Sequence, residues 1–180
     1  MGPVTDLVIP YVALAHAFGR LGCFLNGCCW GCDTALPWGV PYPKSSWSAY
    51  HQQLVDGLIT REAAASLPIH PVQLYETLGL LVIFAVLRMV YRRGPRTGTV
   101  MLGYLAGYGA LRFLVEFLRA DSGHPLLGLT ASQGVAAAML AVGLAGLLWL
   151  RVAPAPNTAN TAEPPMPQEA PAPHGEGGGQ

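Results

Sequence analysis

The sequence predicts an all-α integral membrane protein with about four transmembrane helices, an outer loop and a disordered tail. Composition supports this prediction first: 52% of the 180 residues are hydrophobic and only 11% are charged. Soluble domains carry roughly a quarter charged residues. Patterning supports it second, because four apolar stretches approach the ~20 residues that a helix needs to cross the hydrocarbon core of a bilayer.

The charge balance excludes one class of partner. Ten basic and ten acidic residues cancel, so the chain has no net positive field with which to hold nucleic acid. We therefore expect a membrane as the partner and no nucleic acid. The N-terminus has no basic residue before its apolar stretch, unlike a secretory signal peptide, so we expect this first segment to be retained.

The first two predicted helices cover residues 7–25 and 71–90. Gly19, Arg20 and Gly22 interrupt the apolar run of the first, so we expect a short or broken helix. The second begins after His70, where Pro71 suits the first helical turn because its missing N–H would be unpaired anyway.

The third and fourth predicted helices cover residues 97–118 and 125–150. The third carries Arg112 and Glu116 in its final turns, whereas the fourth has no ionisable residue. Small residues in the fourth suit close packing against a neighbouring helix. These are Ala131, Gly134, Ala138, Gly143 and Gly146.

The remaining segments are polar. Residues 33–69 are rich in turn-forming residues and predict an extramembrane loop with one short helix at most, within a transmembrane domain of residues 1–152. Residues 153–180 are rich in proline, alanine and glycine and predict a disordered tail. Arg88, Arg92, Arg93 and Arg96 flank one short connection, which the preference for basic residues on the inner side makes cytoplasmic. The tail is then cytoplasmic too, and the loop 33–69 is extracytoplasmic.

The third helix carries a polar stripe. Tyr104, Tyr108, Arg112, Glu116 and Arg119 follow the spacing 4, 4, 4 and 3, which places them on one helix face. A forked guanidinium suits a phosphodiester, and a carboxylate four residues on can orient it. The alternative is a structural ion pair between Arg112 and Glu116, with Arg119 extending to the lipid headgroups.

Two further groups carry polar chemistry. In the first helix, Arg20 lies between two glycines that let the backbone approach a ligand, with His16 one turn before and Asn26 after. The alternative is a glycine-rich helix contact. At the start of the second helix, Gln73 and Glu76 share a face where the helix dipole favours negative charge, or they form a simple polar cap. The two intramembrane arginines together predict a lipid-phosphate site between helices.

All four cysteines lie within ten residues: Cys23, Cys28, Cys29 and Cys32. Thiolates at this spacing can converge on a metal, but no second pair of cysteines or histidines completes a site. An outer location permits a disulfide. We therefore favour a disulfide or inert packing over a metal site.

Three ordered motifs resemble the prolipoprotein diacylglyceryl transferase family. They are GRLGCFLNG at residues 19–27, HPVQLYE at 70–76 and GYGALRFLVEFLR at 107–119. LTASQ at 129–133 is similar to the start of the family's last helix, so the resemblance covers about residues 7–150.

The resemblance implies a multi-pass enzyme of the bacterial plasma (inner) membrane that acts in lipoprotein biosynthesis. It transfers a diacylglyceryl group from phosphatidylglycerol to the lipobox cysteine of a prolipoprotein signal peptide, without a metal or cofactor. By motif match, the catalytic residues are Arg20, Arg112, Tyr108 and Glu116. The implied substrate-binding residues are Asn26, Gly27, Gly31, His70, Gln73, Glu76 and Arg119.

The chain departs from the family pattern in two ways. Cys23 replaces an asparagine and Cys28 an acidic residue of the signature, which puts lipid specificity in question. The family also has about three more N-terminal helices, one with a histidine proposed as base, and this chain starts after them. Three interpretations follow: a fragment of a longer gene product, a reduced relative in which His16 or His70 substitutes, or a protein that keeps the lipid site without the chemistry. The alternatives are a non-catalytic phospholipid-binding membrane protein and a cysteine-based redox or metal membrane module.

Overall fold

The computed structural model describes residues 3–45, 49–120 and 129–154. Within these ranges the regular elements are five α-helices, accompanied by isolated β-bridges. They are α1 (Pro3–Asn26), α2 (Ala49–Val55), α3 (Val72–Arg92), α4 (Thr99–Glu116) and α5 (Ala131–Val152). The prediction of an all-α protein is confirmed.

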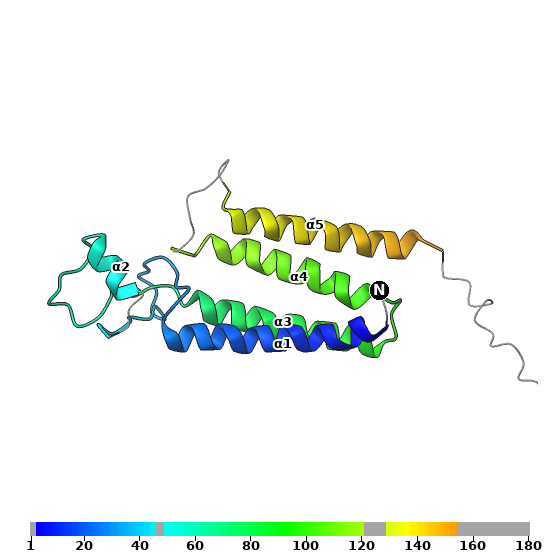
Figure 1. Cartoon of the computed structure of the whole chain (residues 1–180), viewed down its shortest axis with the longest axis horizontal. Helices are drawn as coiled ribbons and strands as arrows, with labels where there is room; N and C mark the ends of the chain where they lie inside the picture. The colour runs from blue at the N-terminus through cyan, green and yellow to red at the C-terminus, as the bar shows by residue number, and fades with distance from the viewer. Residues whose placement is uncertain (1–2, 46–48, 121–128, 155–180) are drawn as a thin grey trace, which may run out of the picture.

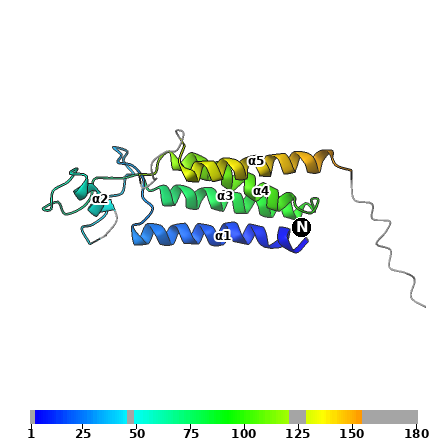
Figure 2. The ribbon, with the colours of Figure 1, turned by 45° about the horizontal axis from the view of Figure 1, so that its top comes forward.

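The four long helices form a bundle in which consecutive helices run in opposite directions (Figure 1). Helices α1 and α4 end, and α3 and α5 begin, at what we term the cap end. The segments 27–45 and 56–71, together with α2, extend beyond this end, as Figure 2 also shows. The opposite end, which holds the connection 93–98 between α3 and α4, is termed the turn end.

Within the described residues, α1, α3 and α5 are long and apolar enough to cross a membrane. Only 11–17% of each span is buried inside the bundle. The outward faces carry apolar side chains such as Leu78, Val82 and Leu148, which suits contact with lipid. The fourth predicted span is α4, an 18-residue helix that carries the polar stripe and is not among these three.

Two sequence-based boundaries are wrong. Helix α1 is continuous over 24 residues rather than short or broken, and a side chain at Gly19 or Gly22 would meet open space, so neither glycine marks a break. Helix α5 begins at Ala131, because Thr130 is its N-cap: its hydroxyl accepts a hydrogen bond from the backbone N–H of Gln133, at 3.2 Å. Residues 125–128, and the predicted tail from residue 155 onward, lie outside the described residues.

Helices α4 and α5 make the closest contact in the bundle. A Cβ atom added at Gly143 would lie 2.5 Å from the backbone nitrogen of Ala106. One added at Gly109 would lie 2.7 Å from the carbonyl oxygen of Ala136. Any side chain at either position would force the two backbones apart. The predicted packing role is confirmed for Gly143 and Gly146, whereas a side chain at Gly134 would meet open space and Ala131 and Ala138 are exposed.

The cap has its own small core. Tyr42, Ala49 and Ile69 are buried there, and Trp30 packs against them. Gln53 of α2 is buried and joins two loop segments: its Nε2 donates to a carboxylate oxygen of Asp33 at 2.5 Å, and its Oε1 accepts from the backbone N–H of Leu67 at 2.7 Å. The short helix expected within residues 33–69 is α2.

The turn end is closed by two charged side chains. Asp6 of α1 is buried and accepts hydrogen bonds from the backbone N–H groups of Gly98 at 2.6 Å and Met101 at 3.1 Å, at the start of α4. Arg96 donates to backbone carbonyls at the end of α5, namely Leu150, Ala153 and Pro154. Each charge therefore satisfies backbone groups that a helix terminus leaves unpaired.

Candidate functional site

Three arginines and two glutamates form a connected network at the cap end of the bundle. Arg20 comes from α1, Glu76 from α3, and Arg112 and Glu116 from α4, while Arg119 follows the end of α4. Three segments that are distant in sequence thus meet where the sequence predicted a phosphate site. We refer to these five residues as the arginine network.

Glu76 is the centre of the arginine network. Its side chain is fully buried, with 0% exposure. One carboxylate oxygen lies 3.1 Å from Nε of Arg20 and the other lies 3.5 Å from Nη1 of Arg112. A single carboxylate therefore links the arginine of α1 to the arginine of α4.

Glu116 forms the second link. One of its oxygens lies 2.8 Å from Nη2 of Arg112 and 3.8 Å from Nε of Arg119. The other oxygen accepts a hydrogen bond from the Thr130 hydroxyl at 2.8 Å, and Nη2 of Arg112 also donates to the Ser132 hydroxyl at 3.1 Å. The start of α5 is thereby joined to the network.

The two intramembrane arginines share one fully buried carboxylate, because Arg20 and Arg112 both pair with Glu76. The ion pairs around Glu76 also lack hydrogen-bonding geometry: Nε of Arg20, Nη1 of Arg112 and both Glu76 oxygens are buried without a hydrogen bond. Buried charged groups that lack hydrogen bonds are costly in free energy unless a further partner, such as a bound ligand, supplies them. Because the side chains of Arg20 and Arg112 are each 15% exposed, an anion can reach them.

Aromatic side chains lie beside the two arginines. The Tyr108 hydroxyl lies next to the Arg20 guanidinium. The His16 ring lies against the Tyr108 ring, with centroids 4.8 Å apart, and Tyr104 stacks on Tyr108 at 5.8 Å. The predicted stripe on α4 therefore faces α1, with its charged part in the network and its aromatic part next to it.

A pocket of about 360 Å³ opens beside Arg112, between α4 and α5. Its polar part is formed by Tyr108, Arg112 and Ser132, and its apolar part includes Val135 and Met139 of α5. A cavity with a cationic end and an apolar wall fits a molecule with an anionic headgroup and a hydrocarbon tail.

Several predicted substrate-binding residues lie outside the arginine network. Nδ1 of His70 is 3.3 Å from the Tyr75 hydroxyl, which accepts a 2.8 Å hydrogen bond from the indole of Trp38. Gln73 is buried and donates to the carbonyl of Cys28 at 2.7 Å. These two residues position the loops of the cap.

Asn26, Gly27 and Gly31 lie along the chain just after α1. Asn26 is exposed, and Gly27 ends the helix with a φ of 74°. A Cβ atom at Gly31 would lie 2.7 Å from both the Cβ of His70 and the carbonyl oxygen of Leu118. Only glycine fits where these three segments meet, which gives Gly31 a packing role.

All four cysteines are free thiols. The thiols of Cys23, Cys28 and Cys29 lie within 4.8 Å of one another, whereas Cys32 is exposed. Burial would raise the pKa of the Cys28 thiol, but hydrogen bonds to Asn26 and the neighbouring thiols outweigh it, so that this pKa lies below its ordinary value. The disulfide that the sequence allowed is not formed in this structure.

Sequence reasoning missed two features of the site. It treated Glu76 as a ligand-binding residue at a helix start, whereas the structure places it between two arginines. It also gave no role to Ser132, which binds Arg112. The Thr130-x-x-Gln133 capping pattern, within the LTASQ motif, is a signal that this segment begins a helix.

The family model for prolipoprotein diacylglyceryl transferase matches residues 1–149. The chain belongs to this family. A phosphatidylglycerol–prolipoprotein diacylglyceryl transferase of Paracidovorax citrulli is 36% identical over 159 residues, which covers 84% of this chain and 52% of the relative. Proteins of the same name from Ralstonia pickettii and Clostridium tetani are 38% and 34% identical, and cover 81% and 77% of this chain.

The chain spans about half the length of the curated relatives it matches, with 50–53% of these three covered. No solved structure matches it. Membership of the transferase family confirms the resemblance seen in the motifs.

Proposed function

We propose that this protein transfers the diacylglyceryl group of phosphatidylglycerol to the lipobox cysteine of a prolipoprotein. One observation carries the proposal: Arg20 and Arg112 share the buried carboxylate of Glu76, in ion pairs whose buried atoms lack hydrogen bonds. Family membership and the names of the relatives support the same reaction.

The lipid phosphate would bind between Arg20 and Arg112. A phosphodiester carries one negative charge, and guanidinium forks present paired donors to its oxygens. The apolar wall at Val135 and Met139 would accept the hydrocarbon chains. Glu76 and Glu116 would hold the two arginines in place, since each contacts Arg112 from a different side.

In the transfer step, the sulfur of the lipoprotein thiol attacks the glycerol carbon that carries the phosphate ester. A C–S bond forms as the C–O bond breaks, and glycerol phosphate leaves with the electron pair. Guanidinium groups aimed at the phosphate stabilise the charge that develops on it. The thiol proton needs an acceptor, and His16 is the better placed of the two candidate histidines, because its ring contacts Tyr108 whereas His70 contacts Tyr75.

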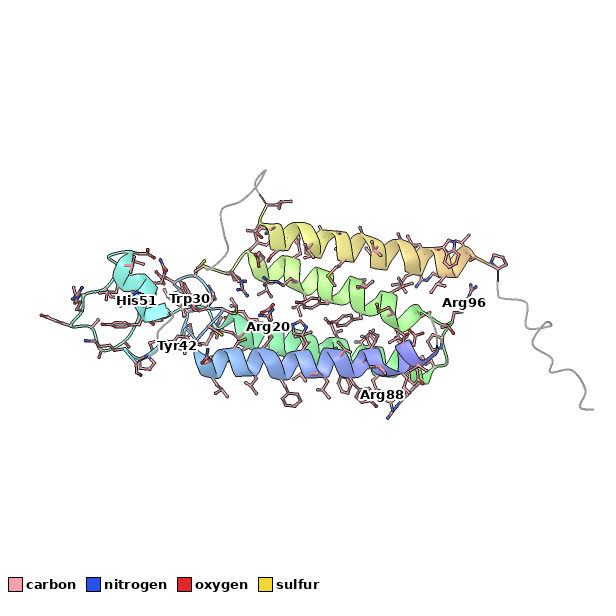
Figure 3. All side chains as sticks on the ribbon, in the orientation of Figure 1. Arg20, Trp30, Tyr42, His51, Arg88 and Arg96 are labelled. Carbon is pink, nitrogen blue, oxygen red and sulfur yellow. The ribbon has the colours of Figure 1, made fainter. Side chains whose placement is uncertain are left out.

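The cap end would face outward and the turn end the cytoplasm of a bacterial plasma membrane. Figure 3 shows Arg88 and Arg96 at the turn end and Arg20 toward the cap end. Basic residues favour the inner side. The arginine network would then lie at the depth where a signal helix presents its outer cysteine.

This orientation can be tested by labelling. Glu62 in the cap and Thr97 at the turn end are both exposed. A cysteine at position 62 should increase the labelling of the protein when an impermeant maleimide is added to intact cells, and a cysteine at position 97 should not. The reverse pattern would leave the network without a reachable substrate thiol.

Transfer itself is tested with the whole chain in vesicles that contain a lipobox peptide. We expect the peptide thiol to gain a diacylglyceryl group, measured by mass spectrometry, in vesicles of phosphatidylglycerol but not of phosphatidylcholine. Binding of phosphatidylglycerol without transfer would instead support a phospholipid-binding protein and overturn the proposed reaction.

A further inference from the structure

Three thiols gather at the end of α1, and neither the arginine network nor the proposed transfer step uses them. Cys23 lies in the last turn of α1, and Cys28 and Cys29 follow the helix. Their sulfur atoms all lie within 4.8 Å of one another, and each residue is partly buried. We refer to this group as the thiol cluster.

The local backbone explains why the thiols converge. Gly27 adopts a left-handed φ of 74°, its N–H donates to the carbonyl of Phe24 at 3.1 Å, and the next N–H donates from Cys28 to the carbonyl of Cys23 at 3.1 Å. This helix-ending turn folds Cys28 back over Cys23. Cys29 then takes a φ of 59°, which is uncommon for any residue but glycine and is found at clamps for ligands.

The cluster suits a thiophilic metal ion. Zinc binds thiolate sulfur at about 2.3 Å, so tetrahedral coordination places two sulfurs about 3.8 Å apart. The three sulfurs, within 4.8 Å here, would close to that spacing by shifts of about 1 Å at most. A disulfide would use two of these thiols and leave the third unexplained.

Electrostatics favours a divalent ion. Three thiolates with Zn²⁺ carry one net negative charge, whereas the same thiolates with Cu⁺ carry two. The smaller net charge costs less to bury, and all three thiols are partly buried.

We propose that Cys23, Cys28 and Cys29 bind one zinc ion, with a fourth coordination position open to water or an added ligand. The ion would fix the segment that joins the ends of three helices. In this segment the backbone carbonyl of Cys28 accepts a hydrogen bond from the side-chain amide of Gln73 of α3 at 2.7 Å. The N–H of Cys32 donates to the carbonyl of Leu118, after α4, at 2.8 Å. The proposal is independent of the transfer reaction.

The test uses the whole chain, purified in detergent under reducing conditions and loaded with Zn²⁺ or Co²⁺. We expect one zinc per chain by elemental analysis, and thiolate-to-cobalt charge-transfer absorption in the cobalt form. Cys23→Ser, Cys28→Ser and Cys29→Ser should each lose the metal. Cys32→Ser is the matched control, because this thiol is exposed and outside the cluster, and it should keep the metal.

A second measurement does not depend on the folding of variants. In the wild-type chain, zinc should protect the three cluster thiols from a maleimide and leave Cys32 reactive. Substoichiometric zinc in the reduced wild-type chain, or the same thiol reactivity with and without zinc, would overturn the proposal. A Cys23–Cys28 disulfide in protein isolated without reductant would also overturn the proposal, if the chain still bound no zinc after this disulfide had been reduced.

Discussion

Both ends of the helix bundle hold buried charged side chains, but the two ends neutralise them differently. At the turn end, Asp6 accepts from two backbone N–H groups and Arg96 donates to backbone carbonyls. At the cap end, Arg20, Arg112 and Glu76 contact one another with buried atoms that lack hydrogen bonds. The first arrangement is complete without a ligand and the second is not.

The difference gives a criterion for reading charges in membrane helices. A charge is costly in hydrocarbon, so each one needs a compensating partner. Where a helix terminus supplies that partner, the charge is explained by folding alone. Where buried ion pairs lack hydrogen bonds, as around Glu76, the fold leaves room for an external anion. Substitutions at the cap end should therefore change activity or lipid binding, whereas substitutions at the turn end should change stability alone.

The largest effect is expected from Arg20→Ala and Arg112→Ala. Each removes a guanidinium that would stabilise the departing phosphate, so the rate of diacylglyceryl transfer should fall about 100- to 1,000-fold. The measurement is lipidation of a lipobox peptide in phosphatidylglycerol vesicles. Arg92→Ala, an exposed arginine at the turn end, is the matched control and should retain its rate. Full activity of either network variant would refute the proposed site.

Glu76→Gln should have the next largest effect, mainly on stability. The change leaves two buried guanidinium groups without their shared carboxylate, which typically costs about 3–5 kcal/mol. Because an anionic lipid can replace the lost charge, phosphatidylglycerol should restore much of the Tm of the variant, and phosphatidylcholine should not. Glu62→Gln changes an exposed residue of the cap, so it should alter neither the Tm nor the dependence of the Tm on the lipid. Equal loss of Tm in both lipids would mean that the network does not bind anions.

Asp6→Ala tests the turn end. The carboxylate accepts two hydrogen bonds at the start of α4, so its loss should cost about 1 kcal/mol, as for other helix caps. Transfer per folded molecule should not change, because Asp6 lies at the opposite end from the arginine network. Thermal unfolding in detergent and the transfer assay measure the two quantities separately. A fall in specific activity would contradict the functional separation of the ends.

The sequence predicted those parts of the molecule that depend on local spacing. The stripe from Tyr104 to Arg119 follows from helical periodicity, and the structure places Glu116 against Arg112 as an i, i+4 pair. The apolar length of each span, and the close contact made by Gly143, likewise depend on composition along a single helix.

The parts that sequence reasoning missed depend on contacts between segments. Glu76 bridges Arg20 and Arg112, which are far from it in the chain, and no spacing rule reports such a bridge. The thiol cluster depends on the left-handed conformation of Cys29, which residue type disfavours. In the sequence, Arg20 indicated a break in the first helix. In the structure, Arg20 pairs with Glu76 of α3, and α1 continues through this position.

The smallest effect is expected from Arg96→Lys, which makes the same chemical change as Arg112→Lys at the other end. Arg96 donates from both terminal nitrogens to carbonyls around the end of α5, at 2.7 Å to Ala153 and 2.8 Å to Pro154. A lysine keeps the charge but loses the planar fork, so it should cost about 0.6 kcal/mol, the mean for polar contacts between membrane helices. Transfer should be unchanged.

Arg112→Lys should show the reverse pattern. The loss of Tm should be small, because the positive charge next to Glu76 and Glu116 is kept. Transfer should be slow, because one ammonium group cannot replace a guanidinium fork that binds carboxylate and phosphate together. Measuring unfolding and transfer on both lysine variants compares the two ends by a single substitution. If both variants lose Tm and neither loses activity, the arginine network is structural like the turn end. If Arg96→Lys lowers only the Tm and Arg112→Lys lowers only the transfer rate, then an incomplete set of hydrogen-bond partners distinguishes a ligand-binding arginine from one that caps a helix.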